Sequence, residues 1–192
     1  MAKFLTLNTH SWLEANSLKK LFDLAETIYS ENYDVICLQE INQDIRGLLT
    51  KEVDGYEKLP GSPALHRDNY ALQLVNYLRS QGRYYYWSWA YNHIGYEKYN
   101  EGVVILSKTP IKVNDILVSD VDDETDFHTR RVLVAETEID QKPITVVSLH
   151  MSWFGKGFES EWQSWRQRCL IPPNHWYSWV ILTTQRILLA MI

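Results

Sequence analysis

Four polar side chains in this sequence could do chemistry together, because each stands at the end of an expected strand. Asn8 follows the first of these strands, Glu40 the second and His150 the last, while Glu101 opens the apolar stretch 102–106. Functional groups of α/β enzymes gather at strand ends. A carboxylate is a hard ligand for Mg²⁺, an amide can orient a phosphate oxygen or water, and a histidine can stabilise a phosphoryl oxygen. These residue types predict a site for a divalent cation and a phosphate.

Each of these residues also has a purely structural interpretation. Asn8 could be a turn residue, Glu40 a carboxylate in the first turn of a helix, where the dipole favours it, and His150 a histidine at a sheet edge. Taken singly, the structural and functional interpretations are about equally good. The joint spacing favours function.

The elements that position these residues are predicted from hydrophobic periodicity. Residues 3–8 alternate as in a strand, and 34–38 form a short apolar, β-branched run that is typical of a buried central strand. A helix capped by Asn16 or Ser17 separates them. Its expected apolar face is Leu18, Leu21, Phe22, Ala25, Ile28 and Tyr29.

The rest of the pattern continues to mix helix and strand. Asp68 is expected to cap a second helix that carries Leu72, Val75 and Leu78 on one face. Five strands follow, separated by prolines and polar clusters, and several of them should pair antiparallel. We therefore predict an α/β sandwich with helices flanking sheet. The strands are expected at 84–91, 102–106, 111–118, 132–139 and 144–150.

The composition narrows the function classes. The chain has 192 residues and a net charge of -5, without a Lys/Arg cluster, which disfavours a nucleic-acid partner without excluding one. Its two cysteines cannot form a disulfide framework, and Cys37 in its apolar run is expected to be buried. The first ten residues do not resemble a signal peptide, and no segment is apolar enough to span a bilayer. We expect a cytoplasmic protein that has no membrane partner.

Four stretches resemble successive motifs of the endonuclease/exonuclease/phosphatase superfamily. The most specific is D-V-I-C-L-Q-E at residues 34–40. The resemblance runs from about residue 3 to 163 and implies a four-layer α/β sandwich in the manner of DNase I and the bacterial sphingomyelinases. It also implies hydrolysis of a phosphoester with Mg²⁺, for which Mn²⁺ could substitute. The other motifs are Leu7-Asn8, residues 101–108 and Val147-Ser148-Leu149-His150.

The resemblance also implies a role for each matching residue. Glu40 becomes the metal ligand, with Asn8 beside it at the metal and the phosphate. His150 becomes a phosphate-contacting catalytic residue and Glu101 a supporting carboxylate. An arginine of the pair Arg130-Arg131 falls where such enzymes place one against the substrate.

The sequence resembles, more specifically, a bacterial subgroup that includes maltose-6'-phosphate phosphatase. This likeness rests on residues 8–12, 91–96 and 120–123. His93 and Tyr96, after the aromatic stretch 84–91, are expected to bind a sugar or another small polar ligand. The alternative, which is better for at least half of the aromatic residues, is that they alternate between core and surface of one strand.

The last 29 residues do not resemble the chain before them. All 24 acidic residues lie in 1–163, whereas 164–192 has none. The superfamily's G-D-x-N motif is missing from these 192 residues, and no Asp follows Asp140. Residues 178–185 can be encoded so that reading from the last base of the Ser178 codon gives L-G-D-F-N-N-P. We therefore expect 1–163 to be the N-terminal part of the superfamily domain and 164–192 a tail out of frame with it, the alternative being a natural, divergent C-terminus.

Three functions follow from these observations. The first is a phosphatase that acts on a small sugar phosphate, which the acidic charge and the aromatic residues favour. The second is a phosphodiesterase, either a nuclease or sphingomyelinase-like. The third is a non-catalytic pseudoenzyme with a structured tail. Because the motif that positions the attacking water is missing, we expect little or no hydrolysis by this chain.

Overall fold

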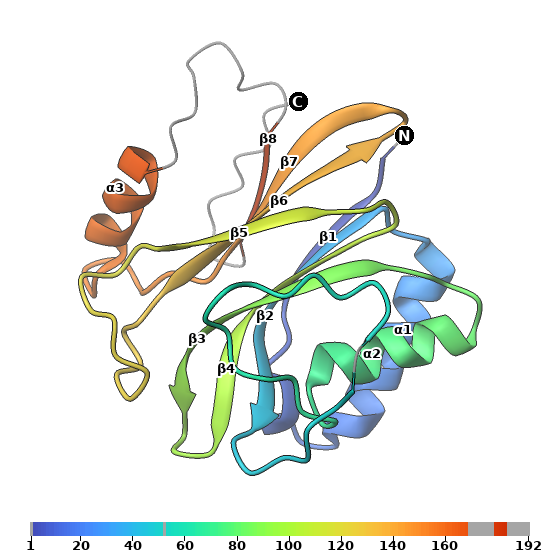
Figure 1. The fold of residues 1–192 in the computed structure, drawn as a ribbon, viewed down its shortest axis with the longest axis horizontal. Coiled ribbons are helices and arrows are strands. Elements are labelled where there is room, and N and C mark those ends of the chain that lie inside the picture. Colours follow the sequence, from blue (N-terminus) through green and yellow to red (C-terminus); the bar gives the residue numbers. More distant parts are fainter. Residues whose placement is uncertain (1, 52, 169–178, 184–192) are drawn as a thin grey trace.

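Two four-stranded sheets face each other in the computed structural model, which describes residues 2–51, 53–168 and 179–183 (Figure 1). The first sheet has the order β1-β2-β4-β3, in which β1 and β2 are parallel and the other neighbours are antiparallel. Its strands are β1 (Phe4–Asn8), β2 (Val35–Asp44), β3 (Tyr86–Gly95) and β4 (Tyr99–Ser107).

The second sheet has the order β5-β6-β7-β8, and its last strand belongs to the segment expected to be a foreign tail. The backbone of β8 pairs in parallel with β7 from Thr145 to Leu149. The division of the chain after residue 163 stays a prediction. The strands are β5 (Lys112–Leu117), β6 (Arg131–Ile139), β7 (Lys142–Leu149) and β8 (Trp179–Thr183).

Helices cover the outer faces of the two sheets. Figure 1 shows α1 and α2 together on one side of the molecule and α3 on the other. A short 3-10 helix, η1, follows β1 and leads towards α1. The described helices are η1 (Ser11–Leu13), α1 (Ser17–Glu31), α2 (Tyr70–Ser80) and α3 (Phe158–Arg168).

Three apolar clusters hold these layers together. One packs α1 and α2 against the first sheet, with Ile28, Leu74 and Trp89 fully buried. A second lies between the sheets and joins Cys37 to Leu133. The third packs α3 against the second sheet through Trp165, with Phe158 and Trp162 partly buried beside it. The predicted α/β sandwich is therefore confirmed, and the layers run helix, sheet, sheet, helix.

Several local expectations need correction. The strand expected to end at Leu38 continues to Asp44, because its second half pairs with the start of β4. The side chain that caps α2 is that of Asn69, which accepts a hydrogen bond from Leu72 N. Asp68 instead accepts one from Asp44 N at 2.6 Å. Asn16 lies at the N-cap of α1 but forms no capping hydrogen bond.

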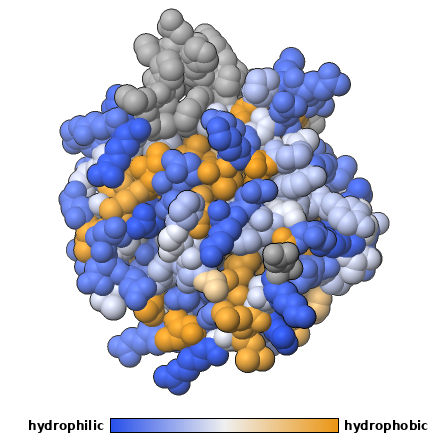
Figure 2. Space-filling model, viewed as in Figure 1, coloured by the Kyte–Doolittle hydropathy of each residue, from blue (hydrophilic) through white to orange (hydrophobic). Residues whose placement is uncertain are grey.

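The expected apolar face of α1 is only half buried. Leu21, Ala25 and Ile28 lie in the core, whereas Leu18 and Phe22 are exposed. The face of the molecule in Figure 2 shows further hydrophobic areas separated by hydrophilic side chains. Within the described residues, no helix is both long and apolar enough to cross a membrane.

Candidate active site

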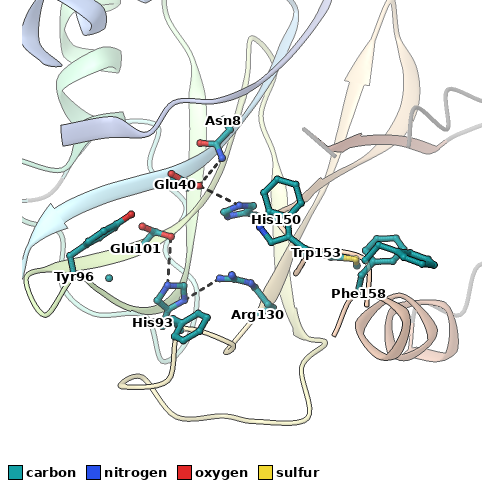
Figure 3. Close-up of a pocket in the computed structure, with 13 residues that line it drawn as sticks. Asn8, Glu40, His93, Tyr96, Glu101, Arg130, His150, Trp153 and Phe158 are labelled. Atoms are coloured by element: carbon teal, nitrogen blue, oxygen red, sulfur yellow. Dashed lines mark hydrogen bonds and ion pairs between the residues drawn. The ribbon is translucent and has the colours of Figure 1, made fainter. Parts of the chain in front are cut away.

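Three of the predicted side chains meet at one edge of the paired sheets (Figure 3). Asn8 ends β1, Glu40 lies within β2, and His150 directly follows β7. The Asn8 amide Nδ2 donates to Glu40 Oε1 at 2.7 Å, and His150 Nε2 lies 3.5 Å from the same oxygen. The structure thus brings together residues that are separated by up to 142 positions in the sequence. Asn8 and His150 lie at strand ends as expected, whereas Glu40 lies in the middle of its strand.

Glu40 is aimed at this edge by a bulge in β2. The pairing with β4 shifts register between Leu38 and Ile41, and Glu40 itself has φ 56°. A side chain other than glycine in this left-handed region costs about 1–2 kcal/mol. Bulges re-aim side chains next to active sites, and such strain persists where the surroundings enforce it. The carboxylate is therefore held in place by the sheet.

Asn8 orients this carboxylate. Its Oδ1 accepts the backbone N–H of His10 at 3.1 Å, which leaves Nδ2 to donate to Glu40. Reversing the amide would place NH₂ against an N–H group, so the hydrogen bonds determine its orientation. In this arrangement Glu40, rather than the Asn8 amide, offers the free oxygen to a cation.

The residues at this edge fit a magnesium ion that keeps most of its water. Among the described residues, no group of three or more His, Cys, Asp or Glu side chains is arranged to hold a metal ion. Mg²⁺ is commonly bound through one or two carboxylates while retaining several waters. Glu40, whose side chain is 18% exposed, provides such a carboxylate at the wall of the pocket.

Glu101 and His93 form a second buried pair beside Glu40. They face each other across β4 and β3, with His93 Nε2 3.6 Å from Glu101 Oε1. Burial and the nearby negative charge of Glu40 raise the pKa of Glu101 to about 7. Burial and the positive charge of Arg130 lower the pKa of His93 to about 4. At neutral pH His93 is therefore uncharged, and the pair is not a full ion pair.

Arg130 and His150 carry buried polar atoms that lack partners. Arg130 Nη1 lies 3.3 Å from His93 Nδ1, but the described residues provide no hydrogen-bond partner for Arg130 Nε or His150 Nδ1. Burial, Arg130 and His93 lower the pKa of His150 to about 3, so its imidazole is neutral at pH 7. Buried polar atoms without partners call for an explanation, and a bound ligand is one. An anion seated here would accept a hydrogen bond from Arg130 Nε, and one from His150 Nδ1 in the tautomer that carries the proton on that nitrogen.

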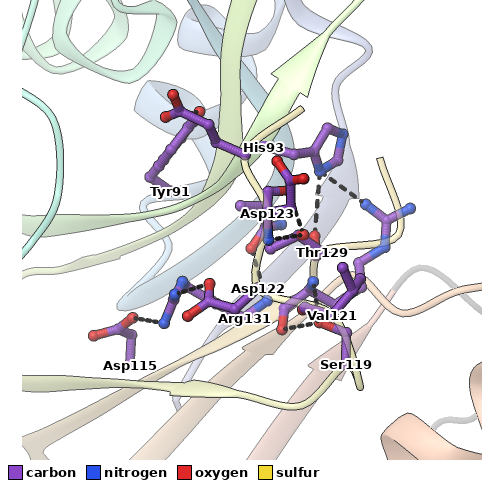
Figure 4. Close-up of polar contacts among 12 residues, drawn as sticks. Tyr91, His93, Asp115, Ser119, Val121, Asp122, Asp123, Thr129 and Arg131 are labelled. Atoms are coloured by element: carbon purple, nitrogen blue, oxygen red, sulfur yellow. Dashed lines mark hydrogen bonds and ion pairs between the residues drawn. The ribbon is translucent and has the colours of Figure 1, made fainter. Parts of the chain in front are cut away.

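Arg131 has a different environment from its neighbour (Figure 4). Its guanidinium pairs with Asp115 at 3.3 Å and Asp122 at 2.6 Å, and its backbone N–H donates to Asn92 Oδ1. It does not line the pocket that contains Arg130. Of the two arginines considered from the sequence, the structure brings only Arg130 to the other candidate residues.

These groups form the polar floor of a pocket of about 950 Å³. We use "floor" for Asn8, Glu40, His93, Glu101, Arg130 and His150.

Exposed aromatic side chains form the mouth of the same pocket, which we call the rim. Tyr96 stands on the turn between β3 and β4, Phe127 on the loop before β6, and Trp153 and Phe154 on the loop after β7. Their exposed fractions range from 60% to 82%, which is high for aromatic residues. Figure 3 shows Tyr96 on one side of the pocket and Trp153 on the other. The rim can therefore contact a ligand that projects from the floor.

The expectation that the aromatic stretch 84–91 and the residues after it contribute to the site was only partly right. Trp87 and Trp89 of the aromatic stretch are fully buried against the helices, and the Tyr85 hydroxyl donates to Tyr33 O. These residues are core, as the structural alternative predicted. Of that region, His93 and Tyr96 do line the pocket.

Sequence reasoning did not single out several site residues. His10, two positions after Asn8, has its Nε2 3.8 Å from Glu40 Oε2. Trp153 and Phe154 follow His150 closely, so their place just after a strand end was an available signal. Phe127 had no such signal, because its position depends on the course of a long loop.

Comparison with known proteins agrees with this fold. The sequence pattern of the Endonuclease/Exonuclease/phosphatase family matches residues 6–191, and the chain belongs to this family of phosphoesterases. No curated protein matches the chain.

Solved structures share the fold. An endonuclease/exonuclease/phosphatase family protein from Leptotrichia buccalis C-1013-b matches with a TM-score of 0.80 and 26% identity, covering 95% of this chain and 66% of that protein. The chain thus spans just under two thirds of that relative.

More distant structures agree in fold alone. TDP2 from D. rerio, complexed with a single-strand DNA product, matches with a TM-score of 0.57 and 13% identity, over 95% of this chain and 58% of that one. The protein from Beutenbergia cavernae DSM 12333 has a TM-score of 0.55 and 16% identity, over 85% and 40%.

Proposed function

We propose that this site belongs to a Mg²⁺-dependent phosphatase lineage that hydrolyses the phosphate monoester of a small sugar. The observation that carries the proposal is the position of Glu40 in one pocket with two buried nitrogen atoms that lack hydrogen-bond partners among the described residues, Arg130 Nε and His150 Nδ1. A carboxylate for a cation and donors for an anion are the complementary halves of a phosphate site.

Two floor residues, Arg130 and His150, have distinct parts in the proposed reaction beside the cation. A divalent cation, when bound, adds positive charge that polarises a phosphoryl oxygen. The Arg130 guanidinium stays charged at neutral pH and balances charge on a non-bridging oxygen. His150, when its one ring proton is on Nδ1, donates that N–H to a second oxygen. Because these donors are already in place, little reorganisation is needed as charge develops.

The rim and the net charge support a sugar as the remainder of the substrate. Trp153 and Tyr96 offer ring faces on which a sugar ring can pack. A pocket of about 950 Å³ has the size of a small-molecule site. The net charge of -5 disfavours a long nucleic acid. We extend the proposal to a subgroup like that of maltose-6'-phosphate phosphatase.

We further propose that these 192 residues by themselves hydrolyse little. No G-D-x-N motif and no Asp after Asp140 are found in them, so the carboxylate that positions the attacking water in this family has no counterpart. The interpretation of 164–192 as an out-of-frame tail lies mostly outside the described residues and stays a prediction. The cytoplasmic location also stays a prediction.

The test compares this chain with a version in which one added base near codon 163 restores the expected frame. Both are assayed with Mg²⁺, or with EDTA, on a panel of hexose and disaccharide phosphates, on bis-p-nitrophenyl phosphate, and on plasmid DNA. We expect the restored chain to release phosphate from sugar monoesters at least about tenfold faster than it cleaves diesters.

We expect the unrestored chain to stay below a few per cent of that rate, and EDTA to abolish it. Preference for the diester or for plasmid nicking would assign a phosphodiesterase instead. An equal rate in the two chains would overturn the proposed impairment. Glu40→Gln in the restored chain should be inactive, with exposed Glu57→Gln as its matched control.

A further inference from the structure

We infer that His10 provides a nitrogen ligand to the cation held by Glu40, and that Glu14 orients this imidazole. The site would then bind Mn²⁺ more tightly than Mg²⁺, because imidazole suits transition metals better than it suits Mg²⁺. The inference rests on the proposed function in one respect, since it takes Glu40 as the carboxylate ligand.

The two oxygens of Glu40 have different neighbours. Oε1 accepts from Asn8 and lies near His150, whereas Oε2 faces His10 Nε2 at 3.8 Å. Two ligand atoms at about 2.1 Å from one octahedral ion are about 3 Å apart when adjacent and about 4 Å when opposite. The observed separation of 3.8 Å therefore lies within the range that a shared ion requires, after a small side-chain adjustment.

The other ring nitrogen of His10 has the partner that a metal-binding histidine usually has. Its Nδ1 lies 3.5 Å from Glu14 Oε1. Histidines that bind metals commonly donate the second ring N–H to a carboxylate, which sets the tautomer and the ring orientation. When Nδ1 closes on Glu14 and donates its proton there as an ion binds, Nε2 presents its lone pair towards Glu40.

The backbone holds His10 in this position. His10 has φ 51° and donates its N–H to Asn8 Oδ1 at 3.1 Å. The preceding residue, Thr9, donates both its N–H and its hydroxyl to Gln39 O, directly before Glu40 in the sequence. The segment with His10 is thus fastened to the strand that carries Glu40.

A simple charge contact between His10 and the two carboxylates explains this geometry less well. Distances of 3.5 and 3.8 Å exceed those of ordinary hydrogen bonds, so the imidazole closes on neither carboxylate. The His10 side chain is also 48% exposed, which leaves the space between it and Glu40 open to an ion from solvent.

The experiment measures cation binding to the full chain by calorimetry and by electron spin echo spectroscopy of bound Mn²⁺. We expect the wild type to bind Mn²⁺ more tightly than Mg²⁺ and to show coupling from a directly bound ¹⁴N nucleus. His10→Gln should lose this coupling and weaken Mn²⁺ binding about 10–100-fold, with a much smaller effect on Mg²⁺. Glu14→Gln, a conservative change of a half-buried residue, should weaken Mn²⁺ binding by less.

His128→Gln is the matched control, because His128 is also exposed and paired with a carboxylate, but its partner is Asp126, whereas His10 lies beside Glu40. Unchanged Mn²⁺ affinity in His10→Gln would overturn the inference. So would a ¹⁴N coupling that persists in His10→Gln but is lost in His150→Gln, because His150 would then be the ligand. If Glu40→Gln still abolished binding in that case, the proposed function would stand. Failure of the wild type to bind either ion would overturn both.

Discussion

The floor and the rim of the pocket differ in nearly every physical property. The floor is buried or half-buried, and its residues are fixed by strand pairing, by a strained backbone at Glu40 and by close contacts between titratable groups. The rim residues are mostly exposed, and Tyr96, Phe127 and Trp153 come from three separate loops or turns. Loops tolerate sequence change far better than paired strands do. The floor therefore suits chemistry shared by a family, whereas the rim suits selection of a particular substrate.

The largest expected effect is a change in the free energy of unfolding with pH, which tests whether the buried floor lowers the stability of the fold. The pKa of Glu101 is about 7 in the fold, against 4.5 as its ordinary value, so the folded protein binds this proton more tightly. The free energy of unfolding should consequently fall by about 3 kcal/mol as the pH rises from 4.5 to 7. Glu101→Gln should lack this fall in urea unfolding with a chelator present.

The pKa shifts of His93 and His150 change the stability with pH in the opposite direction. Their lowered pKa values reduce stability as the pH falls from 6.5 towards 4 and 3, in both the wild type and the variant. The difference between the two proteins isolates Glu101. Exposed Glu136→Gln serves as the control, and a pH-independent difference for Glu101→Gln between pH 5 and 8 would contradict the prediction.

A second prediction separates the floor from its immediate surroundings. Arg130→Met should weaken binding of inorganic phosphate about 10–100-fold, since a hydrogen bond to a charged group contributes about 1.5–3 kcal/mol. Arg131→Met should leave phosphate binding unchanged and lower stability by about 1 kcal/mol, because its partly exposed pairs with Asp115 and Asp122 are lost. Calorimetry and urea unfolding measure the two effects, and an exchange of these outcomes would refute the assignment.

The smallest expected effect concerns the rim. Trp153→Ala should weaken binding of a sugar phosphate about 3–10-fold, as loss of an aromatic contact of about 0.5–1.5 kcal/mol implies, without altering the affinity for inorganic phosphate. Phe22→Ala removes an exposed aromatic side chain of α1 that does not line the pocket, and it should change neither. Equal losses for both ligands on Trp153→Ala would show that rim and floor are not separable.

The sequence predicted the floor better than the rim for a physical reason. Periodicity locates strands, and strand ends converge at a sheet edge, so Asn8 and His150 could be placed together from residue types and spacing. The expected end of its strand places Glu40 with them, although the strand continues to Asp44 and a bulge aims the side chain. No local pattern distinguishes Arg130 from Arg131. Which arginine reaches the pocket depends on which one pairs with Asp115 of the neighbouring strand β5. Phe127 could not be predicted, since its position is set by the loop between β5 and β6 rather than by a period.

The bulge at Glu40 also changes which side of β2 each residue occupies. Before it, Ile36 and Leu38 face the helix layer, and after it this face is taken by Ile41, so the alternation switches from even to odd positions. In a regular strand Glu40 would continue the even series and point among apolar side chains beneath the helices. One surplus residue thus converts a core position into a place at the pocket wall. Deleting this residue would make β2 more regular and remove the proposed cation ligand from the pocket.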